Sequence, residues 1–264
     1  MENMQKIKEE VVLMSSALTT FKEWLVSRGM RDETLRGYKI DTNQFHQWMS
    51  KQSNGPVFVD EVKQDHIESF LEYLVHERKC KPRTVNRKIN ALATFFTCMK
   101  KKKVIKENPV DDIERIKVAE SERIHLTKEE IEAIIKAIKH PVIHYFAVMM
   151  AHTGIRVNEC INLTLKDVNL EEGFVQVING KGGKNRRVPM NEHLVEQMKE
   201  YLEHHRPKID SLYFFALKKS GTVSQQYFNS TLKEACKAAG INKNVSSHIL
   251  RHSKVDPIVK TQIL

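Results

Sequence analysis

Apolar side chains between residues 15 and 105 recur at intervals of three and four, the spacing of one face of an α-helix. Breaks in this pattern divide the segment into four helices. Gly29 follows the first apolar run as a stop, Asp32 is a suitable cap for the second helix, and Asn-Gly-Pro at 54–56 ends that helix. Pro82 suits the first turn of the fourth helix. Four amphipathic helices of this length predict a small helical bundle.

The helical spacing is lost between residues 106 and 124, where polar side chains surround the helix-breaking pair Asn108-Pro109. We interpret this stretch as a linker. It separates a first domain at 15–105 from a second domain at 125–264.

The second domain opens with a capping-box motif, in which Thr127 caps a helix and Glu130 follows three residues later. Further apolar spacing predicts helices at about 128–139, 141–153, 157–163, 191–204 and 224–239. Two short strands are predicted at 174–178 and 187–190, and the glycine-rich loop 179–184 between them predicts a hairpin. The fold class is therefore mainly α, with a four-helix domain followed by a mostly helical domain that contains a small antiparallel β-sheet.

The composition of the chain indicates the kind of partner it binds and the compartment in which it works. The chain has 43 Lys and Arg against 33 Asp and Glu, a net charge of +10, which favours a polyanionic partner because neutralised phosphates release counterions. No apolar run approaches the roughly 20 residues that span a bilayer, and the first residues lack the order of a signal peptide. The 4 cysteines are far apart, as expected of reduced core thiols. We expect a cytoplasmic protein without a membrane partner.

Basic side chains gather at two places where a DNA backbone could lie. Arg83, Arg87 and Lys88 occupy the first turns of the fourth predicted helix. The predicted hairpin carries a second set around its loop, and its glycines allow close approach of the backbone to a ligand. That second set is Lys181, Lys184, Arg186 and Arg187. We expect both sets to contact double-stranded DNA.

Two further clusters have the chemistry to hold one phosphate. Arg156 follows Gly154-Ile155 at the start of a predicted helix, where backbone N–H groups also face an anion. His248 and Arg251 are three residues apart and share one helical face. Arginine binds phosphate bidentately and stays charged, and a lysine such as Lys181 can protonate a departing oxygen once it is desolvated. Cleavage of a phosphodiester without a metal would also need a nucleophile.

These motifs occur in a characteristic order. Thr-Gly-Ile-Arg-Val-Asn-Glu at 153–159 is followed by a Gly-Lys-Gly hairpin at 180–182, by Arg-Val-Pro at 187–189 and by His-Ile-Leu-Arg-His-Ser at 248–253. In this order the chain resembles the tyrosine recombinase, or phage integrase, family along nearly its whole length. The four predicted helices resemble the SAM-like core-binding domain of that family.

The resemblance implies a role for each residue. Arg156 and Arg251 would clamp the scissile phosphate, and Lys181 would be the general acid on the leaving 5′ oxygen. His248 would assist proton transfer or orient the phosphate, and Glu159 would brace an arginine. The resemblance implies no metal and no nucleotide cofactor. It does imply self-association on DNA and a bacterial or mobile-element setting.

The sequence departs from the family pattern in its last residues. The family implies a Leu-Gly-His motif and a nucleophilic tyrosine after Arg251, but no tyrosine follows Tyr227 in this sequence. Tyr213 lies in an apolar run, which favours core packing over a replacement role. We therefore expect a chain that is incomplete before the nucleophile and does not cleave DNA alone. Three alternatives stay open: a nucleophile from another polypeptide, a non-catalytic DNA-binding regulator, or a degenerate remnant of the fold.

One other pair invites a metal-site interpretation. His140 and His144 are four residues apart, but no third ligand follows at a suitable spacing. A pair of histidines on a helix surface is the better interpretation, so we expect no metal site.

Overall fold

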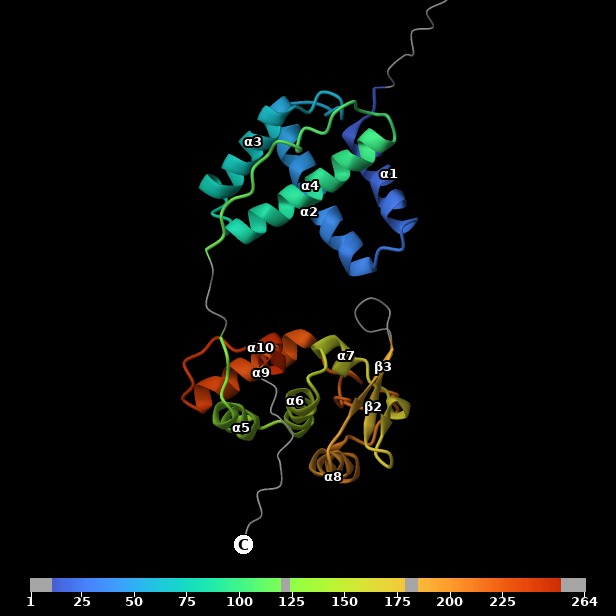
Figure 1. Ribbon diagram of the computed structural model, residues 1–264, viewed down its shortest axis with the longest axis vertical. Helices are drawn as coiled ribbons and strands as arrows, with labels where there is room; N and C mark the ends of the chain where they lie inside the picture. Colours follow the sequence, from blue (N-terminus) through green and yellow to red (C-terminus); the bar gives the residue numbers. More distant parts are fainter. Residues whose placement is uncertain (1–10, 120–123, 179–184, 253–264) are drawn as a thin grey trace, which may run out of the picture. The chain divides into compact units, whose positions relative to one another are not determined.

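The computed structural model describes residues 11–119, 124–178 and 185–252. The chain divides into two compact units, Met1–Ser121 and Glu122–Leu264, each with its own hydrophobic core. Figure 1 shows both units with most of their helices and strands labelled. Each unit is described by itself below.

Within its described residues, the first unit is a bundle of four α-helices, as the apolar spacing predicts. Pro82 is the first residue of its helix, as expected. Asp32 is also a first residue rather than a cap, because Arg31 takes the cap position and leaves Asp32 to favour the positive end of the helix dipole. The helices are α1 (Met14–Val26), α2 (Asp32–Ser53), α3 (Gln64–Glu72), which continues as a π-helical turn (Tyr73–Glu77), and α4 (Pro82–Lys101).

Aromatic side chains fill the core of this bundle. Phe45 and Phe70 meet edge to face at 5.1 Å between ring centroids, and Phe95 and Phe96 at 4.9 Å. All four are fully buried. Edge-to-face pairs place a positive ring edge against a negative ring face, so the cluster fixes the packing of α2, α3 and α4.

The segment predicted as a linker forms neither helix nor strand where it is described, but part of it packs on α4. Val110 and Ile113 are buried in the core of the first unit. The Asn86 side chain donates to the Ile116 carbonyl at 2.8 Å and accepts from its N–H at 2.9 Å. The first compact unit therefore includes residues well beyond position 105.

The second unit is built around α6 (Pro141–Thr153), which is buried on most of its surface. Four helices contact it: α5 (Lys128–Ala137), α7 (Val157–Ile161), α8 (Glu192–Glu200) and α10 (Ser247–His252). The capping box predicted at the start of α5 is confirmed: the Glu130 N–H donates to Thr127 Oγ1 at 3.3 Å, and the Thr127 N–H donates to Glu130 Oε2 at 2.8 Å. A π-helical turn (Tyr201–His205) continues α8, and α9 (Gln225–Ala238) precedes α10.

A small antiparallel sheet packs beside these helices, with strand order β1-β2-β3 among the described residues. The two predicted strands, β2 (Phe174–Val177) and β3 (Arg186–Pro189), pair with Val175 opposite Val188. Strand β1 (Val168–Asn169) was not predicted, because two residues are too short to show alternation. Among the described residues, no helix has the length and apolar character needed to cross a membrane.

Candidate functional site

The site begins where α6 ends and α7 starts. Gly154 adopts a left-handed conformation with φ of +66°, which residues with a Cβ rarely accept, and it stops α6. Ile155 is fully buried and anchors the turn. Arg156 then takes the N-cap position of α7 in an extended conformation, with its side chain 37% exposed. The local sequence thus projects one arginine outward from a rigid junction.

Glu159 holds this arginine through a carboxylate that is only 8% exposed. Its Oε1 accepts from Arg156 Nη1 at 2.9 Å, and its Oε2 accepts from the Arg156 backbone N–H at 2.8 Å. Although burial alone would raise the pKa of Glu159, the hydrogen bonds from Arg186 and then from Arg156 lower it to about 2. Glu159 is therefore a fixed negative charge at neutral pH.

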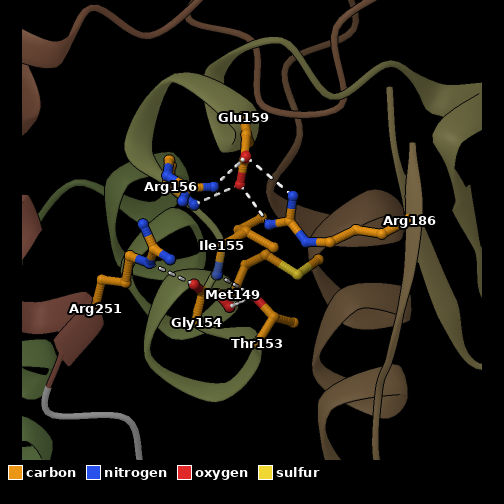
Figure 2. A network of polar contacts seen from close by, with 8 residues as sticks. All are labelled: Met149, Thr153, Gly154, Ile155, Arg156, Glu159, Arg186 and Arg251. Carbon is orange, nitrogen blue, oxygen red and sulfur yellow. Dashed lines mark hydrogen bonds and ion pairs between the residues drawn. The ribbon is translucent and has the colours of Figure 1, made fainter. Parts of the chain in front are cut away.

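Arg186, which we expect to contact DNA, donates to the same carboxylate. Its Nη1 lies 3.0 Å from Glu159 Oε1 and its Nη2 lies 2.6 Å from Oε2, a two-pronged contact of arginine with a carboxylate. Figure 2 shows the two arginines reaching Glu159 from opposite sides. The hydrogen bond to Glu159 raises the pKa of Arg186 further, so this guanidinium stays charged.

Arg251 reaches the same junction from α10. Its Nε donates to the Gly154 carbonyl at 2.8 Å, which fixes the plane of the guanidinium (Figure 2). Among the residues that the structure describes, its two terminal nitrogens have no hydrogen-bond partner. Burial, and after it the positive charge of Arg156, lower the pKa of Arg251. The two arginines predicted to clamp a phosphate thus interact electrostatically.

The other predicted site residues of the second unit divide into three groups. His248 is exposed on α10, one turn before Arg251. Arg187 is exposed on β3, with its guanidinium 4.5 Å from the centroid of the Phe174 ring, a cation–π contact. Lys181 and Lys184 lie outside the described residues.

In the first unit, the three predicted DNA contacts have different surroundings. Arg83 and Arg87 are exposed on α4, four residues apart and so on one face. Arg87 also pairs with the buried Asp41 of α2. Lys88 is buried at 5% exposure, and its Nζ lies 2.8 Å from Asp41 Oδ1 and also donates to Gln44. The ammonium group of Lys88 thus neutralises the buried carboxylate of Asp41, which needs a paired charge.

Two sets of buried ion pairs, those of Asp41 with α4 and that of Glu159 with Arg186, were not predicted from the sequence. Asp41 lies more than forty residues before its basic partners on α4, and Glu159 lies 27 residues before Arg186. Such separations are too long for a local sequence pattern to show. The periodicity of α4 carried a signal for the first contact, because Lys88 falls between Val85 and Leu92 on the apolar face.

The two tyrosines and the histidine pair have neighbours outside the Glu159 network. Tyr213 is half-buried, next to the core residues Phe214 and Phe215, and Tyr227 of α9 lies with its ring 6.3 Å from that of His140. His144 Nδ1 lies 3.0 Å from a backbone carbonyl of α5. Within the described ranges, no group of three or more His, Cys, Asp or Glu side chains could hold a metal ion.

Comparison with known proteins identifies two matching families. Residues 125–261 match the phage integrase family, and residues 18–106 match the N-terminal SAM-like domain of phage integrases. Among curated proteins, a tyrosine recombinase of Thermosipho africanus is 28% identical over 94% of this chain and 87% of its own length. The tyrosine recombinase XerD of Listeria innocua is 29% identical over 91% and 84%, respectively.

Solved structures share the fold. A lambda integrase dimer bound to a core site matches 93% of this chain and 69% of its own at 18% identity, with a TM-score of 0.74. The Tn1549 transposon integrase, in complex with a circular intermediate DNA, matches 90% of this chain and 84% of its own at 17% identity, with a TM-score of 0.68.

Proposed function

Because the chain belongs to the phage integrase family of tyrosine recombinases, we propose that it binds duplex DNA and holds one backbone phosphate between Arg156 and Arg251. The observation that carries this proposal is that both guanidinium groups belong to the α6–α7 junction, where Arg251 donates to the carbonyl of Gly154, two residues before Arg156 (Figure 2). They come from residues 95 positions apart, yet the charge of one lowers the pKa of the other. Two like charges brought together in this way are stabilised by an anion between them.

Each arginine has donors left for that anion. Arg156 uses Nη1 for Glu159, and Arg251 uses Nε for the Gly154 carbonyl. Their remaining N–H groups suit the non-bridging oxygens of a phosphate, which gain charge when the phosphodiester bond is broken. His248, one turn before Arg251, would assist proton transfer or orient the phosphate, and Lys181 would protonate the leaving 5′ oxygen.

The proposed partner is double-stranded DNA. The net charge of +10 supports a polyanion, and the lambda and Tn1549 integrases with the same fold were solved on DNA. We propose Arg83 and Arg87 of α4, with Lys184 and Arg187 of the hairpin, as further phosphate contacts. Lys88 would support Arg87 indirectly by sharing Asp41 with it.

Assembly and location follow from the same partner. The lambda integrase is seen as a dimer on a core site and as a tetramer on a Holliday junction. We propose that this chain also self-associates on DNA. A DNA partner supports a place in the cytoplasm.

The binding proposal is tested with the full chain and a short duplex of random sequence, by fluorescence anisotropy at several salt concentrations. Each phosphate contact contributes about 0.9 to the slope of log affinity against log salt. Arg156→Ala and Arg251→Ala should each lower that slope, by at most about 0.9 because they share one phosphate. Each should also weaken binding roughly 10- to 100-fold, since a charge-assisted hydrogen bond contributes about 1.5–3 kcal/mol. Unchanged affinity and slope in both variants would refute the proposal.

Cleavage is a separate question, because the sequence contains no tyrosine after Tyr227. A pool of nicked duplexes of random sequence traps a covalent 3′-phosphotyrosyl adduct if the chain carries a nucleophile. An adduct that disappears in Tyr227→Phe or Tyr213→Phe would identify that nucleophile. Binding without an adduct would restrict this chain to the phosphate-binding function, and an adduct restored by adding an active relative would locate the nucleophile on that second polypeptide.

A further inference from the structure

We infer that Arg186 is a positioning residue, which orients the Glu159 carboxylate so that Glu159 in turn fixes Arg156 at the phosphate site. The inference rests on the proposed function of Arg156. It replaces the simpler expectation that Arg186 contacts DNA directly.

The first argument is the geometry of the shared carboxylate. Glu159 accepts four hydrogen bonds, two at Oε1 from Arg156 Nη1 and Arg186 Nη1, and two at Oε2 from the Arg156 backbone N–H and Arg186 Nη2. A carboxylate offers about four lone-pair positions, so these bonds saturate it. Both arginines therefore depend on the same orientation of one group (Figure 2).

The second argument is what Arg156 could do alone. The last torsion of a glutamate side chain is broad. Arg156 alone supplies one donor to each oxygen, its Nη1 to Oε1 and its backbone N–H to Oε2, and these two donors are not the parallel pair that matches a carboxylate plane. The parallel N–H groups of the Arg186 fork define that plane. Since the Glu159 side chain is 8% exposed, water has little access to replace the missing donors. The hydrogen bond from Arg186 is also the strongest influence that lowers the pKa of Glu159 against the effect of burial.

The third argument is the origin of Arg186. It is the first residue of β3 and pairs with Val177 of β2, so the sheet sets its position independently of the α6–α7 junction. Glu159 thereby ties Arg156 to a second element, the sheet. The next residue, Arg187, faces the opposite side of the sheet and lies over Phe174, which makes it a matched control with the same charge.

The experiment is a double-mutant cycle on DNA affinity, measured with the full chain and a random-sequence duplex at a temperature where circular dichroism reports every variant as folded. If Arg186 acts through Glu159, Arg186→Gln should weaken binding about tenfold, leave the salt slope at its original value, and add less than about twofold in a Glu159→Gln background. Arg187→Gln should have the same effect in both backgrounds. Arg186→Lys should behave like Arg186→Gln, because a lysine keeps the charge and loses the fork.

Two outcomes would overturn the inference. A direct phosphate contact predicts a salt slope lower by about one, full additivity with Glu159→Gln, and rescue by Arg186→Lys. A role in folding alone predicts a lower melting temperature and unchanged affinity. Where Arg186→Gln does not fold, the cycle is measured with Arg186→Lys. Failure of the proposed function is distinct, because there Arg156→Ala itself leaves affinity and slope unchanged.

Discussion

Glu159 should make the stability of the second unit depend on pH between its ordinary pKa of 4.5 and its folded pKa of about 2. Its pKa falls from an ordinary value of 4.5 to about 2 in the folded protein. At about 1.4 kcal/mol per pKa unit this corresponds to about 3 kcal/mol of stability. Because the folded pKa is the lower one, this stability is fully present above pH 4.5 and is lost as the pH falls toward 2.

The assay is urea unfolding at pH 7, 5, 4 and 3, for the wild type and for Glu159→Gln, which cannot titrate. Both tryptophans, Trp24 and Trp48, lie in the first unit, so their fluorescence reports that unit alone. Far-UV circular dichroism reports both units. The stability difference between wild type and variant should shrink by about 2 kcal/mol between pH 5 and pH 3, since most of the protonation difference builds up over that interval.

The tryptophan signal is the internal control, because Glu159 is outside the unit that it reports. A stability difference that stays constant between pH 5 and pH 3 would refute the reasoning, since it would mean that Glu159 has the same pKa folded and unfolded. A parallel shift of the tryptophan transition would refute the assignment of the effect to the second unit.

Three further predictions concern single contacts. Lys88→Met should destabilise the first unit by about 3 kcal/mol, because the buried Asp41 carboxylate then keeps only the exposed Arg87 as an ion-pair partner. Urea unfolding followed by tryptophan fluorescence checks this, and a loss of stability below about 1 kcal/mol would contradict it. Thr127→Ala should cost the second unit about 1 kcal/mol, the contribution of an N-cap, seen by circular dichroism, whereas an unchanged midpoint would count against the capping box. Gly154→Ala should lower the melting temperature of the second unit, because alanine is strained at the positive φ of this residue. It should also weaken DNA binding, because Arg156 follows that turn. A destabilised variant that binds DNA fully would show that the turn does not position Arg156.

Local chemistry was enough to predict most of the helices. Pro82 and Thr127 mark helix starts through their own backbone and side-chain properties, and the structure places them there. The hairpin strands were also predicted, because alternation and glycine content are visible within ten residues. What could not be predicted locally is where a charged side chain finds its partner.

Lys88 and Arg186 illustrate that limit. Both were expected to contact DNA, Lys88 from its place in the first turns of a helix and Arg186 from its place beside the hairpin loop. Lys88 lies on the apolar face of α4, and Arg186 lies on the same face of β3 as the half-buried Val188, so periodicity indicated that both point inward. Their partners, Asp41 and Glu159, are brought in by tertiary packing, which one-dimensional spacing does not contain.

The separate cores of the two units have a consequence for affinity. If both units carry phosphate contacts, as proposed, DNA binding is bivalent within one molecule. After one unit binds, the other meets the duplex at an effective concentration in the millimolar range, which raises the overall affinity by roughly 10²–10⁴ over either unit alone. The length of the stretch that joins the units then becomes a determinant of affinity, and insertions there would weaken binding without removing a single contact.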